Sequence, residues 1–518
     1  MSIAKQIAFG AVSGWFSRAV SILLGLFLMP VLFRHLGREE LGVWLLLGQS
    51  WAILGILDLG LSATLTRRIA FAVGKRMATS ADASNDQDAC EMADLIETGR
   101  KLYHMMAFGS FLVAFGIGIW GLHHLHLSSL AMPRIYLAWG ILCFSQSVTV
   151  FGSTWSCVLQ GIGYVGWETF LGAFVNSVSL ALQIVVVLAG GGLIGLAIVA
   201  TLGALAQRLL VMKFTRRKNH ALWAMRGVWR PALVKSMAPV SLRAWVTSVS
   251  LVIVLNTDQF FIAGLRGAAQ IPAYRAAYSI FINLQMLSVA LAASSGVFIA
   301  QLWQAGAVQR VHRIVSHNLR LGLSVMVTGG GCVLGLGQRL FNVWIGHGNF
   351  IGMRISCVFF LLLFLETQSF IIATSSRATE DEAFALCAVT AAVLNIALSF
   401  TLGVKFGLFG IALATLIAQL ATSHWFMCYR GLRRLQLSLR SHFTEVLTPI
   451  GILFGFTFGL VRGASILMAG YRDWMAVVVA MLIAGSLLGC SIWLLVLDKS
   501  QRQVAAAFPA RLVRATLG

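Results

Sequence analysis

The sequence has few acidic residues, few prolines and no long polar segment. Only 11% of its 518 residues are charged, and 18 Asp and Glu stand against 39 Lys and Arg. The longest polar stretch, residues 74–101, is too short to bury a core of its own, which excludes a soluble domain of useful size. Apolar runs of roughly 20 residues recur throughout, as transmembrane helices require. We predict an all-α polytopic membrane protein with about fourteen transmembrane helices.

Signals for processing, disulfides and metals are missing as well. The first apolar run is too long for a cleavable signal peptide, carries Arg18 and lacks a small-residue cleavage site. The eight cysteines are scattered, and no pair has metal-ligand or redox spacing. The cluster of His123, His124 and His126 has no acidic or Cys partners, so we expect no metal site there.

The basic residues are plentiful but unevenly placed. The net charge of +21 resembles that of a nucleic-acid-binding protein. However, Lys and Arg are enriched about threefold in alternate loops, which is typical of the cytoplasmic side of a membrane protein. Residues 213–218 and 430–434 are two such basic segments. This asymmetry predicts that both termini are cytoplasmic and argues against a nucleic-acid partner.

Two glycine-rich segments indicate an internal repeat. Gly192-Leu-Ile-Gly195-Leu-Ala197 begins the sixth predicted span, and Gly407-Leu-Phe-Gly410-Ile-Ala412 begins the twelfth. A weaker echo links Leu36-Gly37, before the second span, with Arg266-Gly267, before the eighth. Offsets of roughly 215–230 residues predict two pseudo-symmetric six-helix bundles.

The repeat predicts three parts of the chain. The first bundle with its cytoplasmic linker is residues 1–237, and the second is residues 238–429. Residues 430–518 hold two appended transmembrane helices, a cytoplasmic tail and the alternating Leu and Arg of Tyr429–Ser441. That pattern predicts an interfacial basic helix on anionic lipid, with an ordinary basic loop as the alternative.

Two charges lie deep inside the first predicted hairpin, residues 7–66. Arg18 lies in its first span and Asp58 in its second, 41–66. A charge at bilayer depth costs about 2.5–3.5 kcal/mol, so it normally faces a partner or water. At about 1.5 Å per residue the two antiparallel spans place both charges within ~5 Å of the same depth. We expect Arg18 to pair with Asp58 or to alternate between it and an anionic substrate; a purely structural pair is the alternative.

Later spans carry further polar side chains. Asp258 and Arg275 lie in the outer third across one predicted hairpin, so we expect them to pair and to gate a central cavity between the bundles. Arg243 is a cation of the seventh span, although near a span end it can also reach the interface. Glu366 is a further charged side chain within the tenth span. His424 in the twelfth span is expected to lie only at the membrane interface.

Short motifs of the first hairpin and of the seventh and eighth spans resemble those of one family. They are Leu36–Trp44, Leu57–Leu61, Thr66–Arg68, Asn256–Gln259 and Tyr274–Tyr278. In these segments the chain resembles the polysaccharide and O-antigen flippases of the MATE-like exporter superfamily, and the resemblance covers essentially the whole chain in organisation. It implies two bundles arranged as a V, alternating access, and residence in the bacterial cytoplasmic (inner) membrane.

The resemblance also implies a substrate, an undecaprenyl-diphosphate-linked oligosaccharide that is moved to the periplasmic leaflet. The family's cationic cavity carries over to Arg18, Arg243 and Arg275 as substrate-binding candidates, and Arg is well suited to bind diphosphate. The charge-pair, gating or coupling candidates are Asp58, Asp258 and Glu366. Coupling to H+ or Na+ is expected, without cofactor or metal. The expected partners are membrane lipids and the polymerase and export machinery for polysaccharide.

Other functions remain as alternatives. The first is a cation-coupled drug exporter or a peptidoglycan-precursor flippase. The second is a membrane-embedded glycan polymerase or ligase, which needs catalytic groups in a sizeable outer loop, whereas every predicted outer loop here is short. A scaffold without transport is disfavoured by so many charges at membrane depth. The sequence thus predicts a transporter and not an enzyme.

Overall fold

The computed structural model describes a chain built from helices. It covers residues 20–62, 64–66, 68, 69, 72, 85–123, 132–220, 223, 226–304, 306–379, 385–497 and 502, and no strand occurs among them. In this part of the chain nine helices are long and apolar enough to cross a membrane, and one bent pair adds a tenth. The predicted all-α polytopic fold is confirmed, while the count of fourteen spans stays a prediction.

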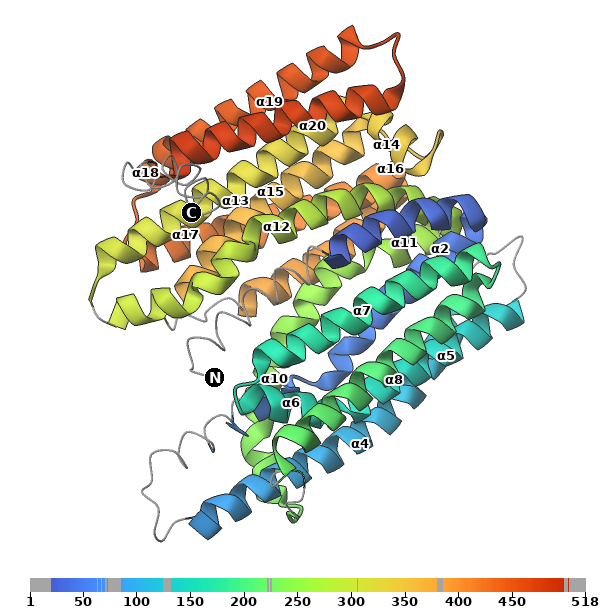
Figure 1. Ribbon diagram of the computed structural model, residues 1–518, viewed down its shortest axis with the longest axis vertical. Coiled ribbons are helices and arrows are strands. Elements are labelled where there is room, and N and C mark those ends of the chain that lie inside the picture. Colours follow the sequence, from blue (N-terminus) through green and yellow to red (C-terminus); the bar gives the residue numbers. More distant parts are fainter. Residues whose placement is uncertain are drawn as a thin grey trace, which may run out of the picture. The chain divides into compact units, whose positions relative to one another are not determined.

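One compact unit comprises Met1–Pro272 together with Ala388–Ile411. Within it α8 packs against both α5 and α7, and α4 packs along α5 (Figure 1). Its helices are Val20–His35, α2 (Arg38–Leu54), η1 (Gly55–Asp58), α4 (Asn85–His123), α5 (Met132–Phe151), α6 (Ser153–Gly161), α7 (Val165–Leu188), α8 (Gly192–Lys218), α10 (Pro231–Asn256), α11 (Asp258–Arg266) and η2 (Ala268–Gln270).

The second compact unit comprises Ala273–Cys387 and Ala412–Gly518. Within it α13 packs against α15, α19 and α20. Its helices are α12 (Ile271–Gln304), α13 (Val308–Leu336), α14 (Gln338–Ile345), α15 (Met353–Arg377), η3 (Leu420–His424), α17 (Trp425–Arg434), α18 (Leu439–His442), η4 (Phe443–Leu447), α19 (Thr448–Leu467), α20 (Asp473–Ser491) and η5 (Ile492–Val496).

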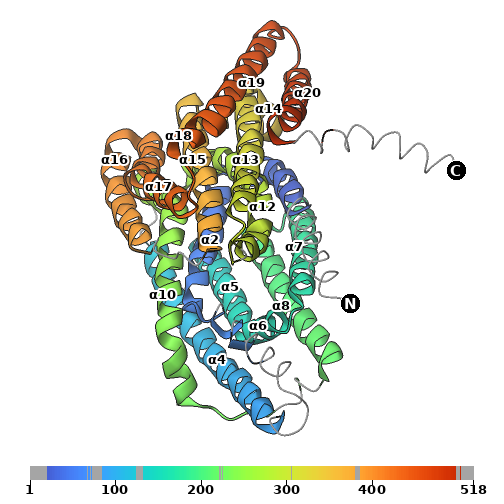
Figure 2. The same ribbon diagram turned by 90° about the vertical axis from the view of Figure 1, so that its left-hand side faces the viewer.

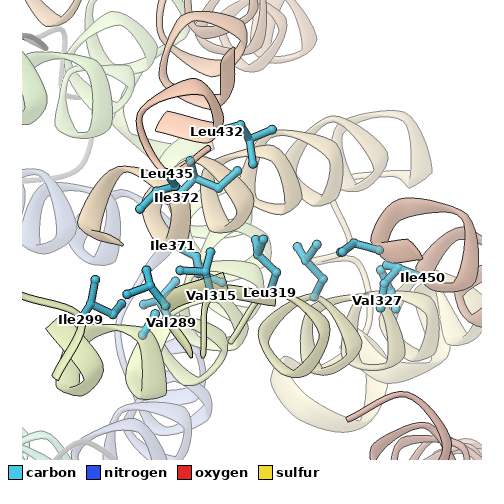
Figure 3. Packing of buried hydrophobic residues seen from close by; sticks show 14 residues of the cluster. Val289, Ile299, Val315, Leu319, Val327, Ile371, Ile372, Leu432, Leu435 and Ile450 are labelled. Carbon is cyan, nitrogen blue, oxygen red and sulfur yellow. The ribbon is translucent and has the colours of Figure 1, made fainter. Parts of the chain in front are cut away.

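A continuous apolar cluster holds the second unit together. Side chains of α12, α13, α15, α17 and α19 converge in it, among them Val289, Val315, Ile371 and Ile450 (Figure 3). Leu432, from the predicted interfacial helix, is only 1% exposed and belongs to the same cluster. At least part of that segment's apolar side therefore packs on protein, and its place at the membrane surface stays a prediction.

The polar stretch before the third predicted span is partly helical. α4 begins at Asn85, so its first turns extend the span through a segment that the sequence placed in a loop. Met92, Leu95 and Ile96 are buried there, in one apolar cluster of the first unit. Their spacing puts them on one face of the helix, which is how a charged segment still contributes to a core.

The same segment is fastened to the start of α10. The backbone N–H of Val228 donates to Asp94 Oδ1 over 2.6 Å, and Arg230 forms a salt bridge with the same carboxylate. The backbone N–H of Arg230 donates to Thr98. Figure 2 shows α4 and α10 from the side. These contacts make α10 part of the first unit, together with α11. The predicted parts 1–237, 238–429 and 430–518 follow the sequence repeat. The division of the chain into two compact units does not test them.

Two predicted spans are interrupted at glycine-containing breaks. The second span leaves α-helical geometry at η1 and turns at Leu59 and Gly60, which have φ of 51° and 69°. The helix α16 (Ala385–Gln419) is broken at Gly407, where φ is 63° and ψ is −140°. A Cβ on Gly403 would lie 3.0 Å from Ile411, so the chain folds back at this break. The break separates the predicted eleventh and twelfth spans.

Candidate functional site

The break in the second span places Asp58 at its centre. Asp58 is the last residue of η1, and the helix resumes after Leu59 and Gly60. Its Oδ2 accepts the backbone N–H of Ser62 at 3.1 Å, and its Oδ1 accepts the Ser62 hydroxyl at 3.0 Å. The carboxylate therefore caps the resumed helix. Irregular backbone at membrane depth is tolerated where it is buried in protein or lines a cavity, and transporters bind their ligands at such breaks.

A buried hydroxyl and thiol extend this cluster. The Tyr103 hydroxyl lies 2.9 Å from the Ser62 hydroxyl and 3.7 Å from the Cys157 sulfur. Tyr103 is fully buried, and Cys157 is 3% exposed. Three helices thus contribute to one polar cluster: the broken second span, α4 and α6.

Arg208 supplies a cation to this region, and it was not among the residues predicted from the sequence. It lies inside the apolar helix α8 and donates to the Ser156 hydroxyl over 2.6 Å. It interacts electrostatically with the carboxylates of Asp58 and Glu168. Glu168, in the first turn of α7, was missed too. The signal was available, since each is a full charge within an apolar run, as Arg18 and Asp58 are.

The three cationic candidates have different outcomes. Arg18 lies outside the described residues, so its pairing with Asp58 stays a prediction. Arg243 lies within α10, and its side chain is not described. The Arg275 guanidinium carbon lies 5.5 Å from the centre of the Tyr278 ring, as in a cation–π contact. Their common cavity stays a prediction.

Asp258 is the first residue of α11. There its carboxylate complements the positive end of the helix macrodipole. The expected pair with Arg275 stays a prediction.

An amide chain ties the end of α10 to two other helices. The Gln259 side chain donates to Gln49 Oε1 at 3.0 Å, and Gln49 in turn donates to Asn256. Thr257 donates to Asn395 Oδ1 at 3.3 Å, which links α10 with α16. Asn395 thus hydrogen-bonds between helices, as such residues often do in membranes.

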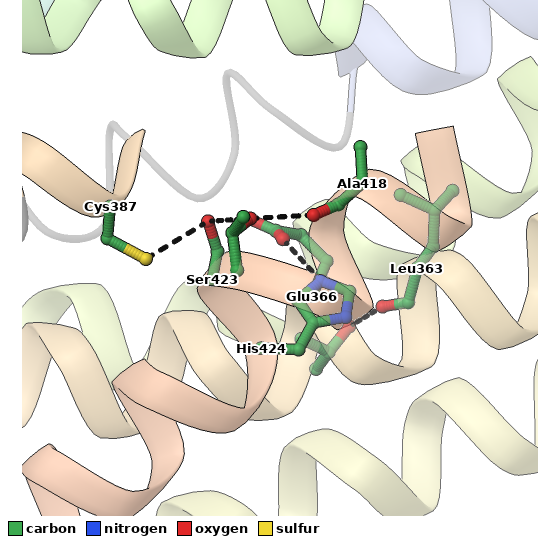
Figure 4. A network of polar contacts seen from close by, with 8 residues as sticks. Leu363, Glu366, Cys387, Ala418, Ser423 and His424 are labelled. Atoms are coloured by element: carbon green, nitrogen blue, oxygen red, sulfur yellow. Dashed lines mark hydrogen bonds and ion pairs between the residues drawn. The ribbon is translucent and has the colours of Figure 1, made fainter. Parts of the chain in front are cut away.

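Glu366 meets His424 inside the second unit. His424 Nε2 lies 3.1 Å from Glu366 Oε2, and the His424 and Glu366 side chains are 4% and 19% exposed (Figure 4). Nδ1 of His424 is buried and has no hydrogen-bond partner among the described residues. The expectation that His424 is only interfacial is therefore wrong. The sequence could not pair these residues, because 58 positions separate them.

His424 of this pair is the last residue of a π-helical turn, η3. One extra residue per turn there re-aims the side chains, and such turns are frequent at functional sites. Thr422 donates to the carbonyl of Ala418, and the Cys387 thiol donates to the Ser423 hydroxyl. Among the described residues no group of three or more His, Cys, Asp or Glu could hold a metal ion.

Comparison with known proteins identifies the fold. No family model matches the chain, and no curated protein does. A solved lipid II flippase MurJ, in an inward closed conformation, matches with TM-score 0.66 and 15% identity over 93% of this chain and 97% of that one. An inward-facing multidrug resistance MATE family transporter matches with TM-score 0.66 and 12% identity over 82% and 98%. The chain has the fold of these transporters.

A third solved structure agrees. A MOP superfamily transporter from Pyrococcus furiosus matches with TM-score 0.57 and 12% identity over 84% of this chain and 96% of that one. The likeness to MATE-like transporters, predicted from short motifs, is confirmed at the level of the fold.

Proposed function

We propose that this chain is a flippase that moves a lipid-linked oligosaccharide from the cytoplasmic to the outer leaflet of a bacterial cytoplasmic membrane. The substrate class is an undecaprenyl-diphosphate-linked glycan such as an O-antigen unit. The observation that carries this proposal is the extent of the structural matches. The flippase match covers 93% of the chain, whereas the matches to the MATE family transporter and to the MOP superfamily transporter cover 82% and 84%. More of this chain has a counterpart in a lipid flippase than in these two transporters.

The polar groups at membrane depth support a transport role. A fold that only anchors other proteins gains nothing from a broken span around Asp58 or from Arg208 inside α8. The proposed transport includes no covalent step, so the glycolipid leaves with the bonds it had on arrival. Arg18, Arg243 and Arg275 are proposed to bind the diphosphate, and Asp58, Asp258 and Glu366 to serve pairing, gating or ion coupling. Both termini are proposed to be cytoplasmic.

Deleting the gene tests the substrate. We expect the lipid-linked glycan to accumulate in the inner leaflet and its polymer to disappear from the cell surface, with both restored by the wild-type gene. If the wild-type gene restores the surface glycan but the lipid intermediate in the deletion strain is chemically altered, the result would point to an enzyme. Cell lysis on depletion would point to the peptidoglycan precursor. A change in drug sensitivity, with normal surface glycan, would point to a drug exporter.

A further inference from the structure

A cationic pocket lies where α11 ends and α16 breaks. Its volume is about 410 Å³, and all the residues that line it belong to the first compact unit. They are Arg266, Gln270, Lys405, Phe406, Gly407 and Leu408. Two of the six are cations, and none of them is acidic. Within the described part of the chain neither cation lies in a salt bridge, and both side chains are exposed.

Arg266 is held in place by the break itself. Its Nη2 donates to the carbonyls of Gly403 and Val404, at 3.4 and 3.2 Å. These carbonyls lie at the end of the first half of α16, where a cation complements the helix dipole. A Cβ on Gly407 would lie 3.5 Å from the guanidinium, so the cation lies directly on the break. The second half of α16 starts at the same place, and the first N–H groups of a helix have no partner within the helix itself.

The first half of the chain shows what the matching place holds. α8 begins with the same Gly-Leu-x-Gly pattern as the second half of α16, and Gly192 has φ of 53° against 63° at Gly407. There the Glu40 carboxylate accepts the backbone N–H of Leu193 at 3.2 Å. An acidic side chain of the protein therefore occupies the start of α8.

The second half has replaced that carboxylate. Glu40 follows Gly37 by three residues, and Gln270 follows Gly267 by three. Gln270 is thus the counterpart of Glu40. It lines the pocket beside Arg266 and Lys405, whose counterparts in the first half are the uncharged Leu36 and Gly190. At the start of α8 the protein's own Glu40 carboxylate supplies the anion. At the break of α16 the matching side chain, Gln270, is neutral, and two cations flank an open pocket.

We propose that this pocket binds a phosphate-bearing anion, which takes the place that Glu40 takes in the first half. Arg and Lys give charge-assisted hydrogen bonds to phosphate oxygens, and Gln270 can donate from its amide. The loop asymmetry predicts that this end faces outside. Two ligands there share the required chemistry: the headgroup of an anionic phospholipid, and the diphosphate of a lipid-linked glycan. The inference stands apart from the proposed transport function, because it concerns binding by the chain itself.

Binding by the purified full-length chain in neutral detergent tests the proposal. The probes are inorganic diphosphate and a fluorescent phosphatidylglycerol. The Arg266→Gln/Lys405→Gln variant removes both cations, while Gln270→Glu keeps them and supplies the carboxylate found in the first half. The matched control is Arg462→Gln/Arg472→Gln, which removes two exposed cations on the same predicted side that do not line the pocket.

We expect the wild type and the control to bind at least one probe, and both pocket variants to bind it at least about tenfold more weakly. Binding of diphosphate alone would identify the ligand as the diphosphate headgroup of the substrate. Binding of phosphatidylglycerol would identify it as a bilayer lipid. The proposal is overturned if neither probe binds, if Gln270→Glu binds like the wild type, or if the control loses as much as the pocket variant. Gln270→Glu should unfold at the wild-type temperature or above, so misfolding does not explain its loss. A failure of glycan transport would leave this result unchanged.

Discussion

At the scale of single residues, Gly42 and Gly48 of α2 differ in the space around them. A Cβ on Gly42 would lie 1.9 Å from the carbonyl oxygen of Ala268, whereas a Cβ on Gly48 would meet no atom of the described residues within 4 Å. Gly42→Ala must therefore push η2 away from α2, and we expect it to lower the free energy of unfolding by about 1–3 kcal/mol. Gly48→Ala should be neutral or slightly stabilising, since Ala favours a helix. Thermal unfolding in detergent measures both; equal midpoints would contradict this packing.

Arg208 offers a second test at this scale. Arg208→Gln removes a cation that interacts electrostatically with the carboxylates of Asp58 and Glu168. We expect a loss of about 3 kcal/mol in stability, because a stranded charge away from water is costly. Arg208→Gln/Glu168→Gln should recover part of that loss, as judged by the unfolding midpoint in detergent. A double variant less stable than the single would show that Glu168 does not depend on Arg208.

The sequence predicted the kinds of residue at the candidate site better than their partners. A charge inside an apolar run is visible in one dimension, and Asp58 and Glu366 were found in that way. The contact of Ser62 with Tyr103 and that of Glu366 with His424 depend on how helices pack. A partner 41 or 58 positions away has no spacing that a single sequence reveals.

At the scale of elements, the helices were predicted well and their interruptions poorly. Apolar runs report length, but the break at Leu59–Gly60 falls inside such a run. The helix that resumes after this break is stabilised by a local hydrogen bond to the Asp58 carboxylate. A hydropathy profile does not report hydrogen bonds, so it does not reveal the break. The start of α4 was missed for the opposite reason. Its acidic residues lower the mean hydropathy of a segment whose buried face holds Met92 and Leu95.

The contact between α15 and η3 leads to a prediction about ion coupling. His424→Gln leaves the Glu366 carboxylate without its partner, so we expect reduced stability in the single variant. Glu366→Gln/His424→Gln should restore the unfolding midpoint. If the pair carries the coupling proton, glycan display at the cell surface stays lost in the double variant at matched expression. Full display by the double variant would make the pair a packing contact.

At the scale of the whole molecule, the orientation in the membrane can be measured directly. Ser438 and His347 are exposed side chains in connecting segments, and the basic-loop asymmetry places the first inside and the second outside. Single cysteines are introduced at these positions after the exposed native ones, Cys90, Cys357 and Cys490, are replaced. In intact cells an impermeant thiol reagent should label position 347 and not position 438. The reverse pattern would invert the proposed direction of transport.

The discontinuity of the first compact unit has a consequence for how the protein is made. That unit needs residues 388–411, which are synthesised long after Pro272. At roughly 5–20 residues per second, the ribosome takes roughly 7–28 s to add residues 273–411. During this interval the early helices sit in the membrane with the partner surface of Asn395 uncovered. A chaperone or insertase that shields polar intramembrane groups would act in that window, and slower translation there would lengthen the exposure.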